Sequence, residues 1–573
     1  MPLLAVKTVF LAIFILNILA VVFLTVDQYY THPIPSQNNL AKSDSIERNH
    51  YRFDDPLLAF LLLEKLDIFE EIKLNSLDGA DYKHTAEGLL ANDNYCSEHR
   101  AYFVNHPELV FNTKLNFITN YWLNHKLRSQ VIPKLGVDLH PDFIPKKENP
   151  TFHSKPRVEA NIFFTRNLFY YQRQVGKQFS CLSQASNHIP GHGKMYRKDH
   201  VAQALVDYAR SYSSRPTCFS YDQYFPKTYG LQDKAQCLEF FEEFNSEKYI
   251  QLKQQRNVVY FRKIGADAHE GSGVFPVKGA EEDKIRERYG NGTLCGRNKN
   301  NNLIQYNVWN PLLVENRKFG FRMFLLVASV NPVIAYYHDG YLRLSIDEYN
   351  PASNDTRTFV TNIGVNLKDA LKNSSFAQMT PEEIQEYTCW FLDDFGEYLY
   401  KNKIVSDPDW VNNYLRPQFK KVMIHLVRMA QSGFLKRSSV FELFGLDFVM
   451  DADLGLWFIE SNTMPLITGF TKGSTLLMNQ MLTDTFEIVM GLTRSRMKRV
   501  IEYINMLAKE NGSTDKLSSE LNVEKRRKEF EKLIKNRFEP EFAPSPNNTF
   551  HIIIDENQTG TKRYAELLEP ECL

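Results

Sequence analysis

The sequence predicts an α+β protein built on largely antiparallel sheets, and three observations support this class. From about residue 216, runs of β-branched and aromatic residues are punctuated by Gly, Pro and Asn, which is typical of strands. Helical patterns lie between these runs without a regular strand–helix–strand repeat, so a parallel sheet is not favoured. The 573 residues are 43% hydrophobic, enough to fill the core of two to four domains.

The N-terminal stretch TVFLAIFILNILAVVFLTV, residues 8–26, contains no charged residue. An apolar helix of this length spans a bilayer at ~1.5 Å per residue. We therefore expect a single-pass membrane anchor, with a cleaved signal peptide or a buried core helix as alternatives, and the side of the membrane that holds the body stays open. Six Asn-x-Ser/Thr sequons favour a lumenal body slightly. They are Asn291, Asn354, Asn373, Asn511, Asn547 and Asn557.

The rest of the chain divides by composition and periodicity. Apolar residues recur three and four apart in DHVAQALVDYARSYSS, residues 199–214, which predicts a helix. Within the mixed region a further helix is predicted to begin at Thr380, where Pro381 and Glu383 complete a capping-box pattern. The expected segments are a transmembrane helix at 8–26, a linker at 27–55, a mainly helical region at 56–215, the mixed domain at 216–470 and a helical region at 471–573.

Charge and cysteine usage narrow the class of protein. The 68 Lys and Arg residues balance 68 Asp and Glu residues, so no net field favours nucleic acid as a partner. The seven Cys residues lie far apart and show neither a CxxC pair nor zinc-ribbon spacing. We expect mostly buried thiols, as in a reducing compartment, with one or two disulfides left open.

Two acidic residues lie inside the apolar stretch FGLDFVMDADLGLWFIESN, residues 444–462. If its two strands pair about the turn DADLG, Asp447 faces Glu460. Asn462 then lies on the same face as Glu460, because side chains alternate along a strand. The same register predicts two further cross-strand pairs, Phe448 with Ile459 and Met450 with Trp457.

A metal ion explains why two carboxylates would be held so close together. Opposed carboxylates repel unless a cation lies between them. Two carboxylates and an amide oxygen suit Mg²⁺, which completes its shell with water and nucleotide phosphates. The alternative is that an Arg or Lys side chain neutralises the acidic pair.

A candidate phosphate site lies upstream, in VVYFRKIGADAHEGSGVFPV, residues 258–277. Here Lys263 stands at the end of a predicted strand, and Gly271 and Gly273 lie in the loop that follows. Backbone amides of such a loop can hold phosphate groups while a Lys supplies a positive charge.

An ordered series of motifs then resembles a known family. The segments YFPKTYGL, LIQYNVWNPLLVENRKFGFR, DGYLRLSIDEYN and FVTNIG precede the acidic hairpin. Together they resemble the tubulin-tyrosine-ligase-like branch of the ATP-grasp superfamily, over roughly residues 216–470. The resemblance implies two α+β lobes that hold ATP between antiparallel sheets, with helical extensions at both ends of the chain.

The resemblance also implies roles for individual residues. Those that would bind ATP are Lys263, Gly271, Gly273, Gln305, Tyr306, Asn307, Val308 and Lys318. Those that would act on the acceptor carboxylate and its acyl phosphate are Arg322, Arg343, Thr361 and Asn362. The Mg²⁺ ligands would be Asp447, Glu460 and Asn462.

The implied activity is ATP- and Mg²⁺-dependent ligation of a free amino acid to a protein acceptor, which by resemblance would be tubulin. Three positions depart from the family pattern: Gly320 replaces an Asp, Phe359 a His and Tyr306 a Lys. The alternative is therefore a catalytically weakened ATP-grasp protein that serves as a structural or binding component of a membrane assembly.

Overall fold

The computed structural model describes residues 117–119, 131, 162–164, 184–264, 273–297, 302–350, 379–434, 436–463, 465–467, 471–511 and 532–573. These belong to a unit that spans Phe53–Leu573, separate from the unit Met1–Arg52. The predicted anchor at 8–26 and linker at 27–55 lie outside the described residues. No helix in the part of the chain that the structure describes combines the length and the apolar character that crossing a bilayer requires.

A ten-stranded sheet forms the centre of the unit, in the order β1-β2-β3-β12-β9-β10-β11. The other three of the ten strands lie off this path, since β13 pairs with β12, β14 with β10 and β8 with β9. Pairing is parallel from β1 to β12 and antiparallel elsewhere, which confirms the expected antiparallel core. The strands are β1 (Phe117–Thr119), β2 (Ile162–Phe164), β3 (Ala185–Asn187), β8 (Leu313–Val314), β9 (Arg317–Val330), β10 (Val333–Glu348), β11 (Cys389–Trp390), β12 (Val440–Met450), β13 (Leu456–Asn462) and β14 (His551–Asp555).

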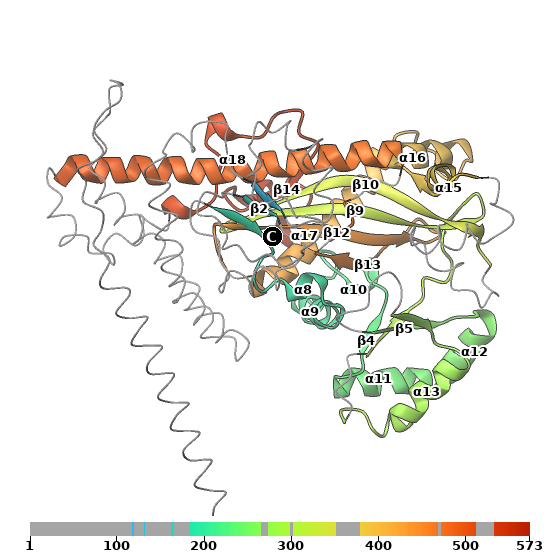
Figure 1. Cartoon of the computed structure of the whole chain (residues 1–573). Coiled ribbons are helices and arrows are strands. Elements are labelled where there is room, and N and C mark those ends of the chain that lie inside the picture. Colours follow the sequence, from blue (N-terminus) through green and yellow to red (C-terminus); the bar gives the residue numbers. More distant parts are fainter. Residues whose placement is uncertain are drawn as a thin grey trace, which may run out of the picture. The chain divides into compact units, whose positions relative to one another are not determined.

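Helices cover both faces of this sheet, which explains why its central strand β9 is buried along its whole length. Phe321 and Met323 of β9 pack with α17 (Arg416–Ala430) in one core. Phe324 points to the other face, into a second core that includes residues of α18 (Lys472–Asn511). Figure 1 shows α18 along one side of β9 and β10 and α17 on the other. A strand buried on both faces shows no polar alternation.

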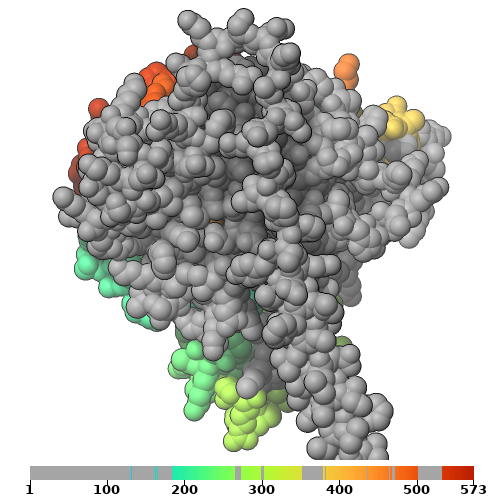
Figure 2. All heavy atoms as spheres, turned by 60° about the vertical axis from the view of Figure 1, so that its left-hand side comes forward, coloured from blue at the N-terminus to red at the C-terminus, as the bar shows by residue number. Residues whose placement is uncertain are grey.

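A smaller sheet forms a second lobe, in the order β4-β7-β5-β6. Its core holds buried aromatic side chains such as Phe240, Phe241 and Tyr260. Figure 2 shows the surface of this lobe in green at the lower edge. Its elements are β4 (Thr228–Gly230), β5 (Tyr260–Ile264), β6 (Val274–Pro276), β7 (Asn302–Tyr306), α11 (Lys234–Phe244), α12 (Glu247–Gln255), α13 (Ala280–Arg288) and η6 (Gly290–Gly292).

The flanking regions contribute strands as well as helices. The helix predicted over residues 199–214 is observed as α9 (Lys198–Ser211), which ends before residues 212–214. The described part of 56–215 also supplies β1, β2 and β3 to the large sheet. The C-terminal region 471–573 is predicted to be helical, and α18 fits this prediction. The prediction is wrong for residues 551–555, which form β14. They are extended because they pair with the backbone of β10. The other helical elements before β9 are α8 (Gly193–Tyr196) and α10 (Tyr221–Tyr224).

The helix expected from Thr380 is two helices. The Thr380 hydroxyl accepts the Glu383 N–H and the Glu383 carboxylate accepts the Thr380 N–H, which confirms the capping box. However, Cys389 and Trp390 leave the helix and pair with β10 as β11. The elements are α15 (Pro381–Thr388), α16 (Leu392–Lys401), η9 (Val411–Leu415), η10 (Gln431–Gly433), η11 (Pro540–Phe542), η12 (Gly560–Tyr564) and η13 (Pro570–Cys572).

The cysteines correct a sequence prediction. Cys218 is bonded to Cys572, and Cys237 to Cys295. The Cα atoms of the two pairs lie 5.2 and 5.7 Å apart, within the usual span of a disulfide. Cys389 is a buried free thiol. The expectation of mostly buried thiols is therefore wrong for these four cysteines, and the alternative of one or two disulfides is confirmed for them, because the fold joins positions as far apart as 354 residues in the chain.

Candidate functional site

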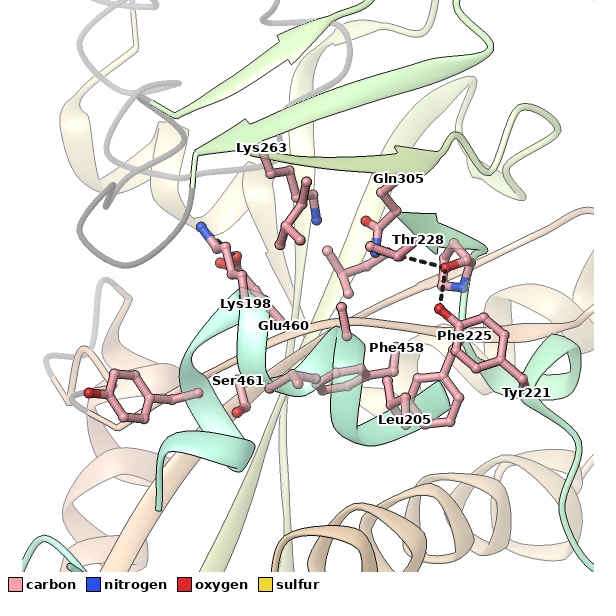
Figure 3. A pocket seen from close by; sticks show the side chains of 16 residues that line it. Lys198, Leu205, Tyr221, Phe225, Thr228, Lys263, Gln305, Phe458, Glu460 and Ser461 are labelled. Carbon is pink, nitrogen blue, oxygen red and sulfur yellow. Dashed lines mark hydrogen bonds and ion pairs between the residues drawn. The ribbon is translucent and has the colours of Figure 1, made fainter. Parts of the chain in front are cut away.

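A cleft lies between the small sheet and the β12–β13 hairpin of the large sheet. It encloses about 480 Å³, part of it open to solvent. Figure 3 shows Lys263 and Gln305 projecting from the small sheet, with Lys198 and Glu460 on the opposite side. The fold therefore places cations, a carboxylate and an amide around one space. Apolar side chains of Val201, Leu205, Phe225 and Phe458 complete much of its wall.

The acidic hairpin has the predicted central pair. Asp447 lies opposite Glu460, as expected. Beyond this pair the register shifts by one residue, so Phe448 faces Phe458 and Met450 faces Leu456. The predicted partners Ile459 and Trp457 are therefore wrong, because a β-bulge after Asp447 leaves one extra residue in β13.

Asp447 of β12 is neutralised by two arginines, one from the adjacent strand β9 and one from β10 beyond it. Arg322 donates from Nε to Oδ1 at 2.6 Å and from Nη2 to Oδ2 at 3.0 Å. Arg343 donates from Nη2 to Oδ1 at 2.7 Å. Burial opposes the charge on Asp447, but the two guanidinium groups hold the pKa of this carboxyl below its usual range. An arginine pair, the alternative to a metal ion, thus balances Asp447 in this structure.

Glu460 has a different partner, which the sequence did not reveal. Its Oε2 lies 3.3 Å from Nζ of Lys198, the first residue of α9. The Glu460 side chain is 27% exposed, whereas that of Asp447 is 14% exposed. Asn462 follows two residues later in β13, paired with Gly445. Lys198 lies in the region 56–215 that the sequence predicts to be mainly helical, and no sequence motif indicated that it belongs to the site.

Lys263 is buried on the far side of the cleft from the hairpin. The residue is only 6% exposed, although a lysine at a strand end is usually solvated. Burial lowers its pKa to about 8, with Glu460 opposing the shift. No carboxylate of a described residue lies within ion-pair distance of its amine. A buried cation without a paired anion is costly, so this position favours an incoming anionic group.

Lys318, Gly320 and Arg322 follow one another on a single face of β9, since side chains alternate along a strand. Lys318 is 8% exposed, and burial lowers its pKa to about 8. Gly320 is paired with Arg343 of β10. The position where the family pattern has an Asp therefore lies between Lys318 and the arginine cluster.

The expected adenine segment connects the two lobes. Gln305 donates from Nε2 to Oγ1 of Thr228 at 3.0 Å. The Tyr306 N–H donates to the Lys227 carbonyl at 2.8 Å, and the Asn307 N–H to the Val259 carbonyl at 2.9 Å. Both sides of the segment are thus fixed by neighbouring backbone. Val308 follows, half-buried, without regular structure.

Several predicted residues lie outside the described residues, namely Gly271, Phe359, Thr361 and Asn362. Gly273 is described and buried, and its carbonyl accepts the Ile264 N–H at 2.9 Å. The fold therefore brings together Lys263, Gln305 and Glu460 around the cleft and Arg322, Arg343 and Asp447 beside it.

Comparisons with known proteins find similar sequences. The sequence matches the Tubulin-tyrosine ligase family over residues 177–498, more than half of the chain. The human "Inactive polyglycylase TTLL10" is 25% identical over 307 residues, which cover 50% of this chain and 42% of that protein. The "Protein polyglycylase TTLL10" of Macaca fascicularis is 26% identical over 306 residues, 50% of this chain and 46% of the relative. The human "Tubulin polyglutamylase TTLL7" is 26% identical over 306 residues, which cover 49% of this chain and 30% of that protein. The chain thus spans less than half the length of these relatives.

Proposed function

Because the chain belongs to the tubulin-tyrosine ligase family, we propose that it is an ATP-dependent ligase that joins a free amino acid to a carboxylate of a protein acceptor. An acceptor carboxylate oxygen attacks the γ-phosphorus of ATP, which gives an acyl phosphate and ADP. The amine of the amino acid then attacks the acyl carbon, phosphate leaves, and a proton passes from the amine to solvent. The protein contributes positioning and charge neutralisation.

The observation that carries the proposal is the buried lysine facing the acidic hairpin across the cleft. Lys263 is buried without a paired carboxylate among the described residues, and Glu460 lies on the opposite wall. A nucleotide phosphate between them would neutralise Lys263, and a metal ion would neutralise Glu460. Gln305 to Val308, held between the two lobes, would meet the adenine edge. This arrangement supports an ATP-grasp cleft.

A magnesium ion at the hairpin is part of the proposal. A carboxylate offers about four lone-pair sites, and arginine N–H groups fill three of those of Asp447. Glu460 is partly exposed and makes an ion pair only at Oε2 among the described residues. Asp447, Glu460 and Asn462 would hold Mg²⁺, which supplies positive charge to the reacting phosphate when bound. In the described residues no group of three or more His, Cys, Asp or Glu side chains could hold a metal ion, so the remaining Mg²⁺ ligands would be the Asn462 amide, water and nucleotide phosphate.

Arg343 has the unsatisfied capacity that an acceptor carboxylate would use. Its Nη2 is bonded to Asp447, whereas its buried Nε has no hydrogen-bond partner in the described structure. An unpaired buried donor is costly, so an incoming carboxylate or acyl phosphate would be stabilised there. Thr361 and Asn362 are proposed, from the family pattern alone, to act on the same acceptor group.

The names of the relatives support the reaction class more than the substrate. They include polyglycylases and a tubulin polyglutamylase, whose products are amides of amino acids. The human relative named an inactive polyglycylase shows that membership of the family alone does not ensure turnover. The departure at Gly320 makes a protein that retains the cleft but serves as a binding component the second candidate.

Calorimetric titration of Mg-ATP into the full chain tests the proposal. We expect binding that falls at least about tenfold in Glu460→Gln, because a charge-assisted contact contributes about 1.5–3 kcal/mol. Asp453→Asn removes an exposed acid from the turn of the same hairpin and is the matched control, with unchanged binding expected. If the parent chain binds no Mg-ATP at millimolar concentration, the ligase proposal fails and the binding-component alternative stands.

A further inference from the structure

The disulfides indicate the compartment in which this domain folds. Cys237 joins Cys295 inside the small lobe, and Cys218 joins Cys572 at the large one. All four residues are at most 8% exposed, so each pair is part of a packed core. Separate buried thiols are the rule in a reducing cytosol, whereas paired cysteines are retained where disulfides form and persist. A disulfide in each lobe is therefore typical of a protein that folds in an oxidising compartment.

The surface of the domain carries acceptor sites for N-linked glycans. The sequons in the described residues begin at Asn291, Asn547 and Asn557, and all three asparagines are exposed. Each has a Thr two positions later, as the oligosaccharide transfer requires. Exposure of three separate sequons means that glycans could be carried without disturbing either core.

Local contacts at these sites are compatible with a glycan. Asn291 lies in η6 and accepts a hydrogen bond from Arg286 at Oδ1, 2.8 Å away, which leaves the modified atom, Nδ2, outside this bond. The Asn547 backbone N–H donates to the Ser545 hydroxyl, a contact that does not involve the Asn547 side-chain amide. The Asn557 Nδ2 donates to the Asn536 carbonyl and to the Asp555 carboxylate. A glycan on Nδ2 would replace one of its two hydrogens and leave the other as a donor.

The N-terminal sequence agrees with this location. Residues 8–26 form an uncharged apolar run after Lys7. Both a cleaved signal peptide and a signal anchor with the basic residue on the cytosolic side would pass the body of the chain across the membrane. A buried core helix at 8–26, or an anchor inserted in the opposite orientation, would not.

From these three observations we propose that the ligase domain lies on the non-cytosolic side of a secretory-pathway membrane, with N-glycans on its exposed sequons. Resting on the function proposed above, the inference extends to the substrate: the acceptor is a carboxylate of a lumenal or secreted protein and not cytosolic tubulin. ATP and the amino acid must then be supplied in the same compartment.

Endoglycosidase treatment of the full chain expressed in animal cells tests the location. We expect a mobility shift on removal of N-glycans, and the loss of one glycan step in Thr559→Ala. Thr559→Ser is the matched control, because it retains the sequon at Asn557 and the same exposed position. Microsomes from the same cells should protect the domain from added protease until detergent is present. A chain without any glycan that is digested in intact microsomes overturns the proposal.

Thiol trapping supplies a readout that does not depend on glycans. Cells are quenched in acid, and the full chain is alkylated before and after reduction. We expect Cys218, Cys237, Cys295 and Cys572 to react only after reduction, and their reaction without reduction contradicts the proposed compartment. Neither result depends on nucleotide binding. A glycosylated, oxidised chain that binds no Mg-ATP would refute the ligase and keep the location, whereas an unglycosylated chain that binds Mg-ATP would do the reverse.

Discussion

The two walls of the cleft differ in whether their charged side chains have partners of opposite charge. On the hairpin wall, Asp447 accepts three hydrogen bonds from two arginines, and Glu460 is paired with Lys198. On the opposite wall, Lys263 is buried with no ion pair among the described residues, and burial lowers its pKa to about 8. Within the described residues, the hairpin wall is balanced by the protein itself, whereas the charge of Lys263 on the small lobe would be balanced by the anion proposed above.

This difference separates residues that stabilise the fold from residues that await a ligand. Removing a member of a balanced buried pair leaves its partner uncompensated, so stability should fall. Replacing a buried, unpaired cation by an apolar side chain should raise stability but reduce anion binding. The sign of the stability change therefore distinguishes the two walls.

Asp447→Ala should give the largest effect. It leaves Arg322 and Arg343 buried without their shared carboxylate, and breaking such a network costs about 3–5 kcal/mol. Chemical denaturation would show this as a lower midpoint with an unchanged slope. Since the folded carboxyl has a lowered pKa, its contribution is present above the unfolded value, ~3.9, and is lost as pH falls further. A loss under about 1 kcal/mol would mean that the pair is not integral to the fold.

Lys263→Met should lower the affinity for Mg-ATP by about 10- to 100-fold, the equivalent of one charge-assisted hydrogen bond. The variant keeps the length and apolar stem of the side chain, so the fold should be retained. Calorimetry measures the affinity, and Lys284→Met, on the outer face of α13, serves as a control. Equal affinity in parent and variant would remove Lys263 from the nucleotide site.

The same variant should be more stable than the parent near pH 7, by roughly 1–3 kcal/mol, because the parent buries a charge. Lys263 has a folded pKa of about 8, below the unfolded value of ~10.4. Between these values the unfolded chain binds more protons, so the stability of the parent rises with pH. The gap between parent and variant should therefore close toward pH ~10. Denaturation at several pH values measures it, and a constant gap contradicts the assignment.

The two arginines should differ in a smaller way. Arg322 makes two hydrogen bonds to Asp447 and Arg343 makes one. A lysine can replace a single hydrogen bond but not the paired geometry of a guanidinium. We expect Arg343→Lys to cost about 1 kcal/mol and Arg322→Lys about twice that, as measured by denaturation. Equal costs would show that the bidentate geometry contributes little.

Gly320→Asp should have the smallest effect. It restores the acid of the family pattern between Lys318 and Arg322, and one added polar contact should raise the affinity for Mg-ATP by about two- to tenfold. Gly320→Asn has nearly the same size without the charge and is the control. If both variants behave alike in the calorimeter, the missing Asp does not limit nucleotide binding.

The sequence pattern was sufficient to predict the parts of the site that lie close together in the chain. Strand alternation and a tight turn placed Asp447 opposite Glu460, as the structure confirms, although the bulge beside them could not be read from residue types. Burial of Lys263 and the contact of Lys198 with Glu460 depend on α9 packing between two lobes. The partner of Cys572 was equally hidden, since 354 residues separate it from Cys218. Contacts between distant segments carry no local signature.

The last strand of the large sheet has a consequence for biosynthesis. Tyr337 of β10 pairs with His551 of β14, so this edge of the sheet is completed by residues translated long after β10 itself. Until then, an apolar strand presents unpaired backbone groups to other chains. Sheets closed by such distant segments form slowly. The nascent polypeptide should therefore depend on chaperones that hold this edge until residues 551–555 leave the ribosome.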